Sequence, residues 1–132
     1  PPYGTLDKLA RYGHCGSQGL REAVDVVNPR LVLSGHVHES YGLLKVGSTY
    51  FLNTSNFGSV EGVDGPEPGG YFATLQLRMD ESGQKFLREV VWKRLVAGRV
   101  VDLCEVSIDK KLRANEKIID TKEYEIMGRF LL

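Results

Sequence analysis

The sequence predicts an α/β sandwich that is incomplete in this chain, mostly β and with one clear helix. Three observations support this: one segment has helical apolar spacing, a short run of branched apolar residues follows it, and the second half alternates apolar and polar residues. One helix cannot cover both faces of a sheet that contains so apolar a strand. We therefore expect part of the sandwich, most simply an N-terminal half, to come from outside this sequence.

The first 58 residues should hold the helix and the buried strand. Residues 1–16 contain two prolines and three glycines, which predicts a loop. Ser17 is a candidate N-cap for a helix that runs to about Asn28, before Pro29. Its predicted apolar stripe consists of Leu20, Ala23, Val24 and Val27.

Residues 31–33, Leu-Val-Leu, predict a strand buried on both faces, since such runs are typical of sheets covered by helices. Residues 48–52 predict the next strand, and residues 53–58 predict a loop. Residues 61–70 are rich in glycine, proline and acids, which predicts a flexible surface connection.

An antiparallel meander is predicted beyond residue 70, because three alternating segments are separated by turn-forming residues. The predicted strands are residues 71–79, 85–94 and 99–106, with turns at 80–83 and 97–98. Residues 109–132 fit neither a strand nor a helix clearly, and we assign them to neither.

Charge and cysteine content restrict the classes of function. Lysine plus arginine equals aspartate plus glutamate at 17 each, so no basic excess favours nucleic acid. No apolar run approaches the roughly 20 residues that cross a bilayer, so we expect no membrane partner. Cys15 and Cys104 are far apart and form no zinc motif, which favours a reducing, cytoplasmic location.

The sharpest motif is Gly35-His36-Val37-His38, directly after the predicted buried strand. Imidazole is a common ligand for zinc and related metals, and ligand sites favour the carboxyl ends of strands in α/β folds. Gly35 would let the backbone approach such a site closely, and Glu39 could orient a ring. The alternative is two surface histidines. Two histidines alone do not complete a metal site, so further ligands must come from elsewhere.

His14 is a weaker candidate. It could contact a substrate phosphate or sugar, while Gly16 and Ser17 offer helix N-terminal amides that suit an anion. The alternative is a loop histidine beside an ordinary N-cap. Cys15, next to it, is interpreted as a small filler rather than a nucleophile.

The apolar strand, Gly-His-x-His, the turn at Tyr41-Gly42 and residues 47–53 together resemble the last motif of the calcineurin-like metallophosphoesterases. Pro1-Pro2-Tyr3-Gly4 is similar to the segment directly after the preceding motif of that family, and the resemblance covers residues 1–58. It implies that residues 1–132 are the C-terminal portion of a single α/β/β/α sandwich domain of the metallophosphoesterase type, with the motifs in 1–60 and the antiparallel strands and tail in 70–132. The chain begins without methionine, so we expect its start to be cut.

The resemblance implies two divalent ions, Mn, Fe, Ni or Zn, with His36 on one and His38 on the other. It also implies a phosphoester or nucleotide substrate and a contact from the loop at Asn53, where the family has Asn-Pro-Gly and this chain has Asn-Thr-Ser. The Asp-x-His, Gly-Asp and Gly-Asn-His motifs of the family are absent from the sequence. We therefore expect no catalytic residue in this chain and little turnover by the chain alone.

Three hypotheses remain. The first is part of a phosphomonoesterase or phosphodiesterase. The second is a non-catalytic protein-interaction scaffold on the same fold, which some family members are. The third, a nuclease, is disfavoured because the chain has no basic stripe.

Overall fold

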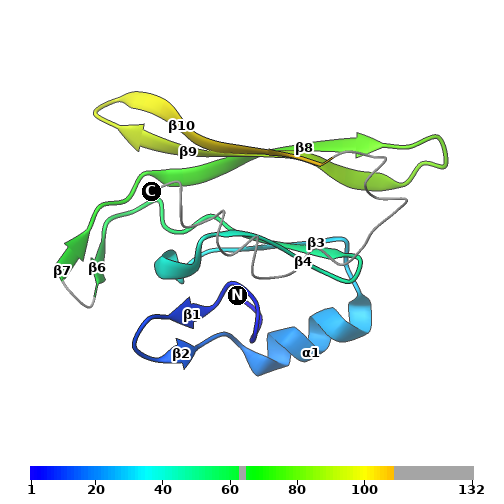
Figure 1. The fold of residues 1–132 in the computed structure, drawn as a ribbon, viewed down its shortest axis with the longest axis horizontal. Helices are drawn as coiled ribbons and strands as arrows, with labels where there is room; N and C mark the ends of the chain where they lie inside the picture. Colours follow the sequence, from blue (N-terminus) through cyan, green and yellow to red (C-terminus); the bar gives the residue numbers. More distant parts are fainter. Residues whose placement is uncertain (63–64, 109–132) are drawn as a thin grey trace. The chain divides into compact units, whose positions relative to one another are not determined.

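The computed structural model describes residues 1–62 and 65–108, which fall into two compact units (Figure 1). The first is Pro1–Asn56, and the second holds the described residues from Phe57 onward. The change from a motif-bearing part to antiparallel strands was expected near residue 60. That both parts belong to one domain stays a prediction, and the tail from residue 109 lies outside the described residues.

A mixed three-stranded sheet forms the centre of the first unit. Its strands are β3 (Leu31–Ser34), β4 (Gly42–Val46) and β5 (Thr49–Asn53), in the order β3-β5-β4. β5 is parallel to β3 and antiparallel to β4. The carboxyl ends of β3 and β5 therefore lie at one edge of the sheet, where Ser34 pairs with Asn53. The α/β class, with mostly strands and one α-helix among the described residues, is as predicted.

Helix α1 (Gln18–Val27) begins and ends as the sequence predicts. The Ser17 hydroxyl accepts a hydrogen bond from Leu20 N at 3.1 Å, and Asn28 ends the helix in the left-handed conformation. The predicted apolar stripe is only partly covered. Val24 is buried, whereas Leu20 is 44% exposed and Val27 73%.

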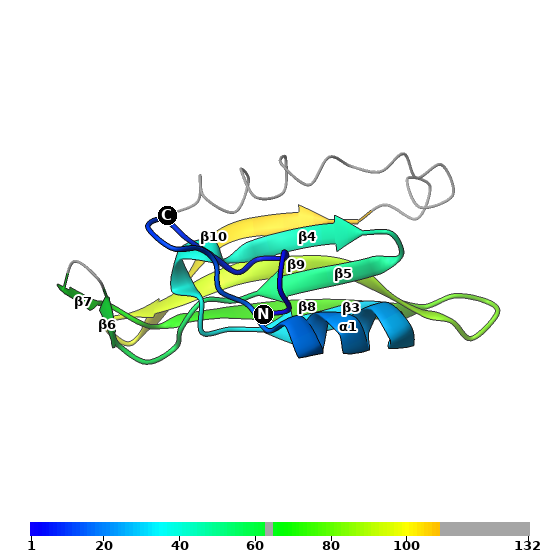
Figure 2. The same cartoon turned by 90° about the horizontal axis from the view of Figure 1, so that it is seen from below.

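The core of the first unit lies between α1 and the sheet, and Figure 2 shows α1 running along β3. Its buried members are Leu6, Val24, Leu44 and Phe51, with Val32 and Val46 packed against them. The prediction that residues 31–33 are buried on both faces is wrong: Leu33 is 60% exposed, and Leu31 and Val32 are only half-buried. Among the described strands β3 pairs only with β5, so it is an edge strand, and alternation places Leu33 on the face opposite Val32.

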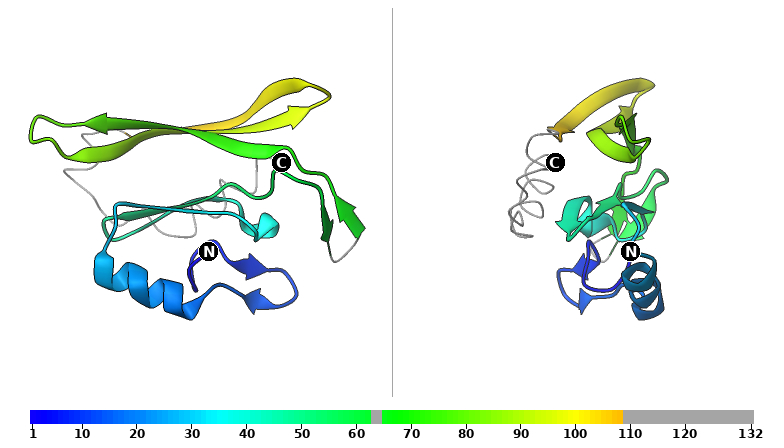
Figure 3. Two further views of the ribbon diagram at one scale, coloured as in Figure 1. Left: turned by 180° about the vertical axis from the view of Figure 1, so that it is seen from behind. Right: turned by 90° about the vertical axis from the view of Figure 1, so that its right-hand side faces the viewer.

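The N-terminal segment is more ordered than the predicted loop. β1 (Lys8–Leu9) and β2 (Gly13–His14) form a small antiparallel hairpin. The short 3-10 helix η1 (His38–Ser40) lies next to β1 (Figure 3), where Ser40 Oγ donates to Lys8 O at 2.6 Å. The segment that carries the histidine pair is thus bonded to the hairpin.

The second unit confirms the antiparallel meander. β8 (Tyr71–Met79), β9 (Lys85–Val96) and β10 (Arg99–Ser107) pair in the order β10-β9-β8. Ala97 and Gly98 form the β9–β10 turn with φ of 49° and 75°, and positive φ at both central residues suits a right-twisted hairpin.

The second unit also contains a short hairpin of β6 (Val60–Gly62) and β7 (Gly65–Glu67), in the region that the sequence predicts as a flexible connection. Across residues 1–62 and 65–108, no helix has the length and apolar character needed to span a bilayer.

Candidate metal-binding loop

The histidine pair lies where the sequence predicts, on the loop that leaves the carboxyl end of β3. His36 is exposed and His38 is half-buried at the start of η1. The loop passes close to the segment that follows β5: a Cβ added at Gly35 would lie 3.1 Å from Ser55 O. Glycine at this position therefore permits the close backbone approach that the sequence predicts.

His36 occupies a strained turn. Val37 N donates to Gly35 O at 3.0 Å, closing a three-residue turn around His36, whose φ is 77°. This corresponds to the rare γ-turn with positive φ. A left-handed conformation costs a residue with a Cβ about 1–2 kcal/mol. The surrounding structure must therefore hold the turn in place.

Asn53 supplies much of that support. It is fully buried at the end of β5. Its Nδ2 lies 2.7 Å from Val37 O, 3.0 Å from Ser40 O and 3.1 Å from Leu6 O, and its Oδ1 accepts from Ser55 N at 3.0 Å. An amide has two N–H groups, so the three carbonyls share two hydrogens. One side chain thus joins the histidine loop, the strand end and the N-terminal segment.

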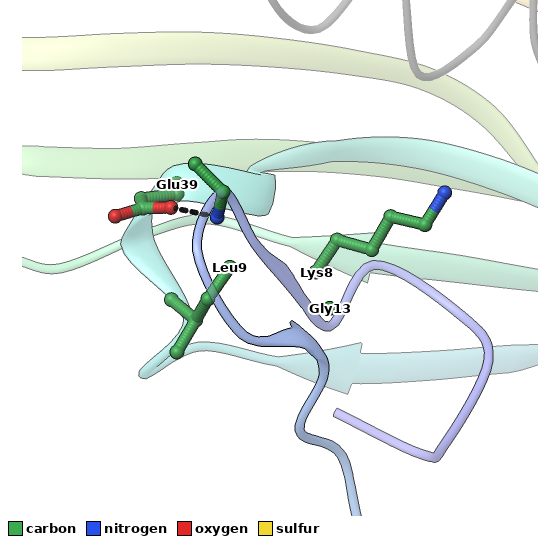
Figure 4. Close-up of a pocket in the computed structure, with 5 residues that line it drawn as sticks. Lys8, Leu9, Gly13 and Glu39 are labelled. Atoms are coloured by element: carbon green, nitrogen blue, oxygen red, sulfur yellow. Dashed lines mark hydrogen bonds between the residues drawn. The ribbon is translucent and has the colours of Figure 1, made fainter.

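Further bonds tie the loop to its neighbours. Ser55 Oγ shares its one hydrogen between His38 O at 3.3 Å and Asn56 Oδ1 at 2.8 Å. The Glu39 carboxylate accepts from Ala10 N at 2.7 Å, so in this structure it anchors the β1–β2 hairpin (Figure 4). A shallow hollow of about 690 Å³ opens here, lined by Lys8, Leu9, Ala10, Gly13 and Glu39.

A second polar cluster surrounds Asp7, which is fully buried. Its Oδ2 accepts from Gly16 N at 2.8 Å and Gly4 N at 3.1 Å. Its Oδ1 lies 2.6 Å from Nδ1 of His14, whose side chain is 32% exposed. The ring of Tyr3 lies 5.4 Å from the His14 ring, centroid to centroid. Asp7 was missed in the sequence, because its partners lie up to nine positions away and mostly belong to the main chain.

The predicted anion cradle at the start of α1 is already hydrogen-bonded. Gly16 N donates to Asp7, and Ser17 N donates to Pro1 O at 3.0 Å. An anion would have to displace both bonds to use these two amides. Gly16 and Ser17 as substrate contacts stay predictions that this geometry does not favour. Asn53 as a substrate contact also stays a prediction, since the structure places its amide inside the loop.

The described residues do not complete a metal centre. Across ranges 1–62 and 65–108, no three side chains of the His, Cys, Asp or Glu types are grouped so that they could hold a metal ion. Zinc needs about three protein ligands in a catalytic site and four in a structural one. His36 and His38 therefore fit a metal site only as two of its ligands.

Comparisons with known proteins give two partial matches, and no family model matches the chain. UPF0046 protein K07C11.7 of Caenorhabditis elegans is 36% identical over 55 residues, which cover 42% of this chain and 19% of that protein. A Vps29 single mutant from Entamoeba histolytica matches in structure with a TM-score of 0.45 and 20% identity, over 78% of this chain and 53% of the other. The chain thus spans about a fifth of the curated relative and about half of the solved structure.

Proposed function

We propose that this chain is the C-terminal part of a dinuclear-metal phosphoesterase, to which it supplies His36 and His38 as metal ligands. One observation carries the proposal: the turn at His36 has unfavourable backbone geometry and lies beside a carbonyl held by the buried Asn53 amide. Strained residues of this kind cluster at functional sites.

The proposed activity is hydrolysis of a phosphomonoester or phosphodiester, including nucleotides. Two divalent ions, Mn, Fe, Ni or Zn, would polarise the phosphoryl group and activate water. The role of this chain is to orient two imidazoles at the edge where β3 and β5 end. Two neutral imidazoles cannot offset the repulsion between two adjacent dications, so the remaining ligands, including a bridging carboxylate, would come from an N-terminal half.

The test uses the protein extended upstream to include that half, with Mn²⁺ and a chromogenic phosphodiester. We expect turnover that is lost in His36→Gly and in His38→Ala. His36→Gly is the informative variant, because glycine adopts a φ of 77° without strain and removes only the imidazole. Unchanged turnover in His36→Gly would exclude the proposed role of this loop.

A second candidate function, a non-catalytic interaction scaffold, is favoured by the exposed apolar residues of the first unit. Leu33 on the edge strand is 60% exposed, and Val26 on α1 is 86% exposed. A partner segment that pairs with β3 would cover the edge with which no other described strand pairs. Light scattering on the chain with and without Leu33→Lys tests this: self-association that the substitution abolishes supports docking, and a monomer in both cases opposes it.

A further inference from the structure

We propose that Asp7 is a positioning residue that fixes the tautomer of His14, so that His14 Nε2 and the ammonium of Lys8 together bind a phosphate group of the substrate. The identity of the ligand rests on the proposed function, whereas the tautomer does not. The observation behind the proposal is the 2.6 Å contact between a fully buried carboxylate and Nδ1 of a partly exposed imidazole.

The hydrogen bonds of Asp7 determine which ring nitrogen carries the proton. Oδ2 accepts from the amides of Gly4 and Gly16, so both of its neighbours are donors. Oδ1 of the carboxylate can only accept, and its partner is His14 Nδ1. Nδ1 must therefore hold a hydrogen, which leaves Nε2 as the nitrogen that exchanges a proton with solvent or ligand. The hydrogen bonds from the Gly4 and Gly16 amides fix the Asp7 carboxylate, and the carboxylate in turn fixes the orientation of the His14 ring through Nδ1.

The neighbours of His14 favour an anion. Lys8 is its register partner across the β1–β2 hairpin, and directly paired residues of antiparallel strands project from the same face. Arg21 of α1 also lies nearby, with Nη1 3.5 Å from Tyr3 O, but its guanidinium is paired with Asp25 at 2.9 Å, so Lys8 is the cation that the pair supplies. The other polar groups at the pair are the Tyr3 ring and the Cys15 thiol, which donates to Asp7 O at 2.9 Å. When phosphate binds, Nε2 takes up a proton from solvent or from the phosphate itself and donates it in a hydrogen bond, so the doubly protonated ring lies between the phosphate and the Asp7 carboxylate.

The position of this pair relates it to the metal-binding loop. Lys8 O accepts from Ser40 Oγ, and Leu6 O accepts from Asn53. β1 thus lies between His14 and η1, and adjacent strands are about 4.8 Å apart. His14 is therefore one strand removed from the histidine loop, and Lys8 lies on the strand between them. The His14–Lys8 pair would bind a part of the substrate beyond the reacting phosphoryl group, such as the second phosphate of a nucleotide.

The first arm of the test reads the tautomer of His14 by long-range ¹H–¹⁵N NMR of the chain at a pH where its histidines are neutral. We expect the proton on Nδ1 in the wild type. In Asp7→Asn, the amide oxygen stays with the Gly4 and Gly16 amides and the NH₂ group faces Nδ1, so the proton should move to Nε2. A wild-type proton on Nε2, or an unchanged tautomer in folded Asp7→Asn, overturns the proposal. If Asp7→Asn does not fold, the wild-type spectrum decides alone.

The second arm titrates the chain with inorganic phosphate, against sodium chloride at matched ionic strength. We expect the His14 ring signals to move toward the doubly protonated pattern with phosphate only. Lys8→Gln should weaken phosphate binding about twofold to fivefold without changing the tautomer. Equal responses to phosphate and chloride overturn the phosphate assignment. The proposed function fails separately, if Mn²⁺ leaves the rings of His36 and His38 unaffected, and that result does not alter the His14 tautomer.

Discussion

Replacing Asn53 should destabilise the first unit strongly, and more by aspartate than by alanine. Asn53→Ala leaves three buried carbonyls and the Ser55 amide without this partner. With two N–H groups and one accepted bond, about three net hydrogen bonds are lost, which amounts to about 3 kcal/mol of unfolding free energy. Asn53→Asp has nearly the same size, but it places a carboxylate against three carbonyl oxygens. It should therefore cost more than the alanine variant.

The matched control is Asn56→Ala. Asn56 is half-buried, and its Oδ1 accepts from Ser55 Oγ at 2.8 Å. Its loss should cost within about 1 kcal/mol. Trp92 belongs to the second unit, so its fluorescence would report on the wrong part of the chain. Urea denaturation followed by far-UV circular dichroism measures the unfolding free energy, and hydrogen exchange at the Ser55 amide measures the local opening around Asn53. Asn53→Asp as stable as the wild type, or Asn53→Ala no worse than Asn56→Ala, would refute the reasoning.

Three further sets of substitutions test separate parts of the structure. Gly16→Ala should lower the unfolding free energy by about 2 kcal/mol, because its Cβ would lie 2.7–2.8 Å from three oxygens. Gly19→Ala on α1 adds a Cβ that meets nothing within 4 Å, so it should raise the unfolding free energy by up to about 1 kcal/mol. Urea midpoints compare the two variants. The unfolding free energy of His36→Gly should exceed that of His36→Ala by about 1 kcal/mol, because only glycine relieves the strain of the positive φ. Equal urea midpoints for the two variants would remove the case for strain. The hydrogen bond and repulsion from Glu89 raise the pKa of Glu105 above 4.5. The native state therefore binds this proton more tightly than the unfolded state, stability falls as pH rises through that pKa, and Glu105→Gln should flatten this part of the stability–pH curve.

Regular elements could be predicted where one periodicity dominates. The cap at Ser17, the stop at Asn28 and the three long strands of the second unit follow from local patterns. β4 was missed because Gly42 indicates a turn and Leu43-Leu44-Lys45 does not alternate; these residues are buried on both faces of the strand. Leu33 was assigned to the interior because an apolar run does not reveal whether both faces of its strand are covered.

The sequence predicts the two histidines of the candidate site, but not the buried polar side chains that hold the surrounding segments in place. The Gly-His-x-His motif stands out because it holds two of the three histidines of the chain. Asn53 was noted only as a substrate contact, and Asp7 was not noted at all. Both act through main-chain groups of other segments; Asn53, for example, bonds to Leu6, 47 positions away. Side chain to main chain bonds at such separations leave no spacing signature in a single sequence.

The most direct test of the account is a Mn²⁺ titration of the 132-residue chain, followed by the histidine ring signals in NMR. Two imidazoles cannot hold two adjacent dications, so in this chain alone we predict that a single Mn²⁺ binds both rings weakly. The rings of His36 and His38 should therefore broaden together, and His36→Gly should abolish most of the broadening at His38. Broadening confined to His14, or none at His36 and His38, would contradict the claim that this loop presents two metal ligands.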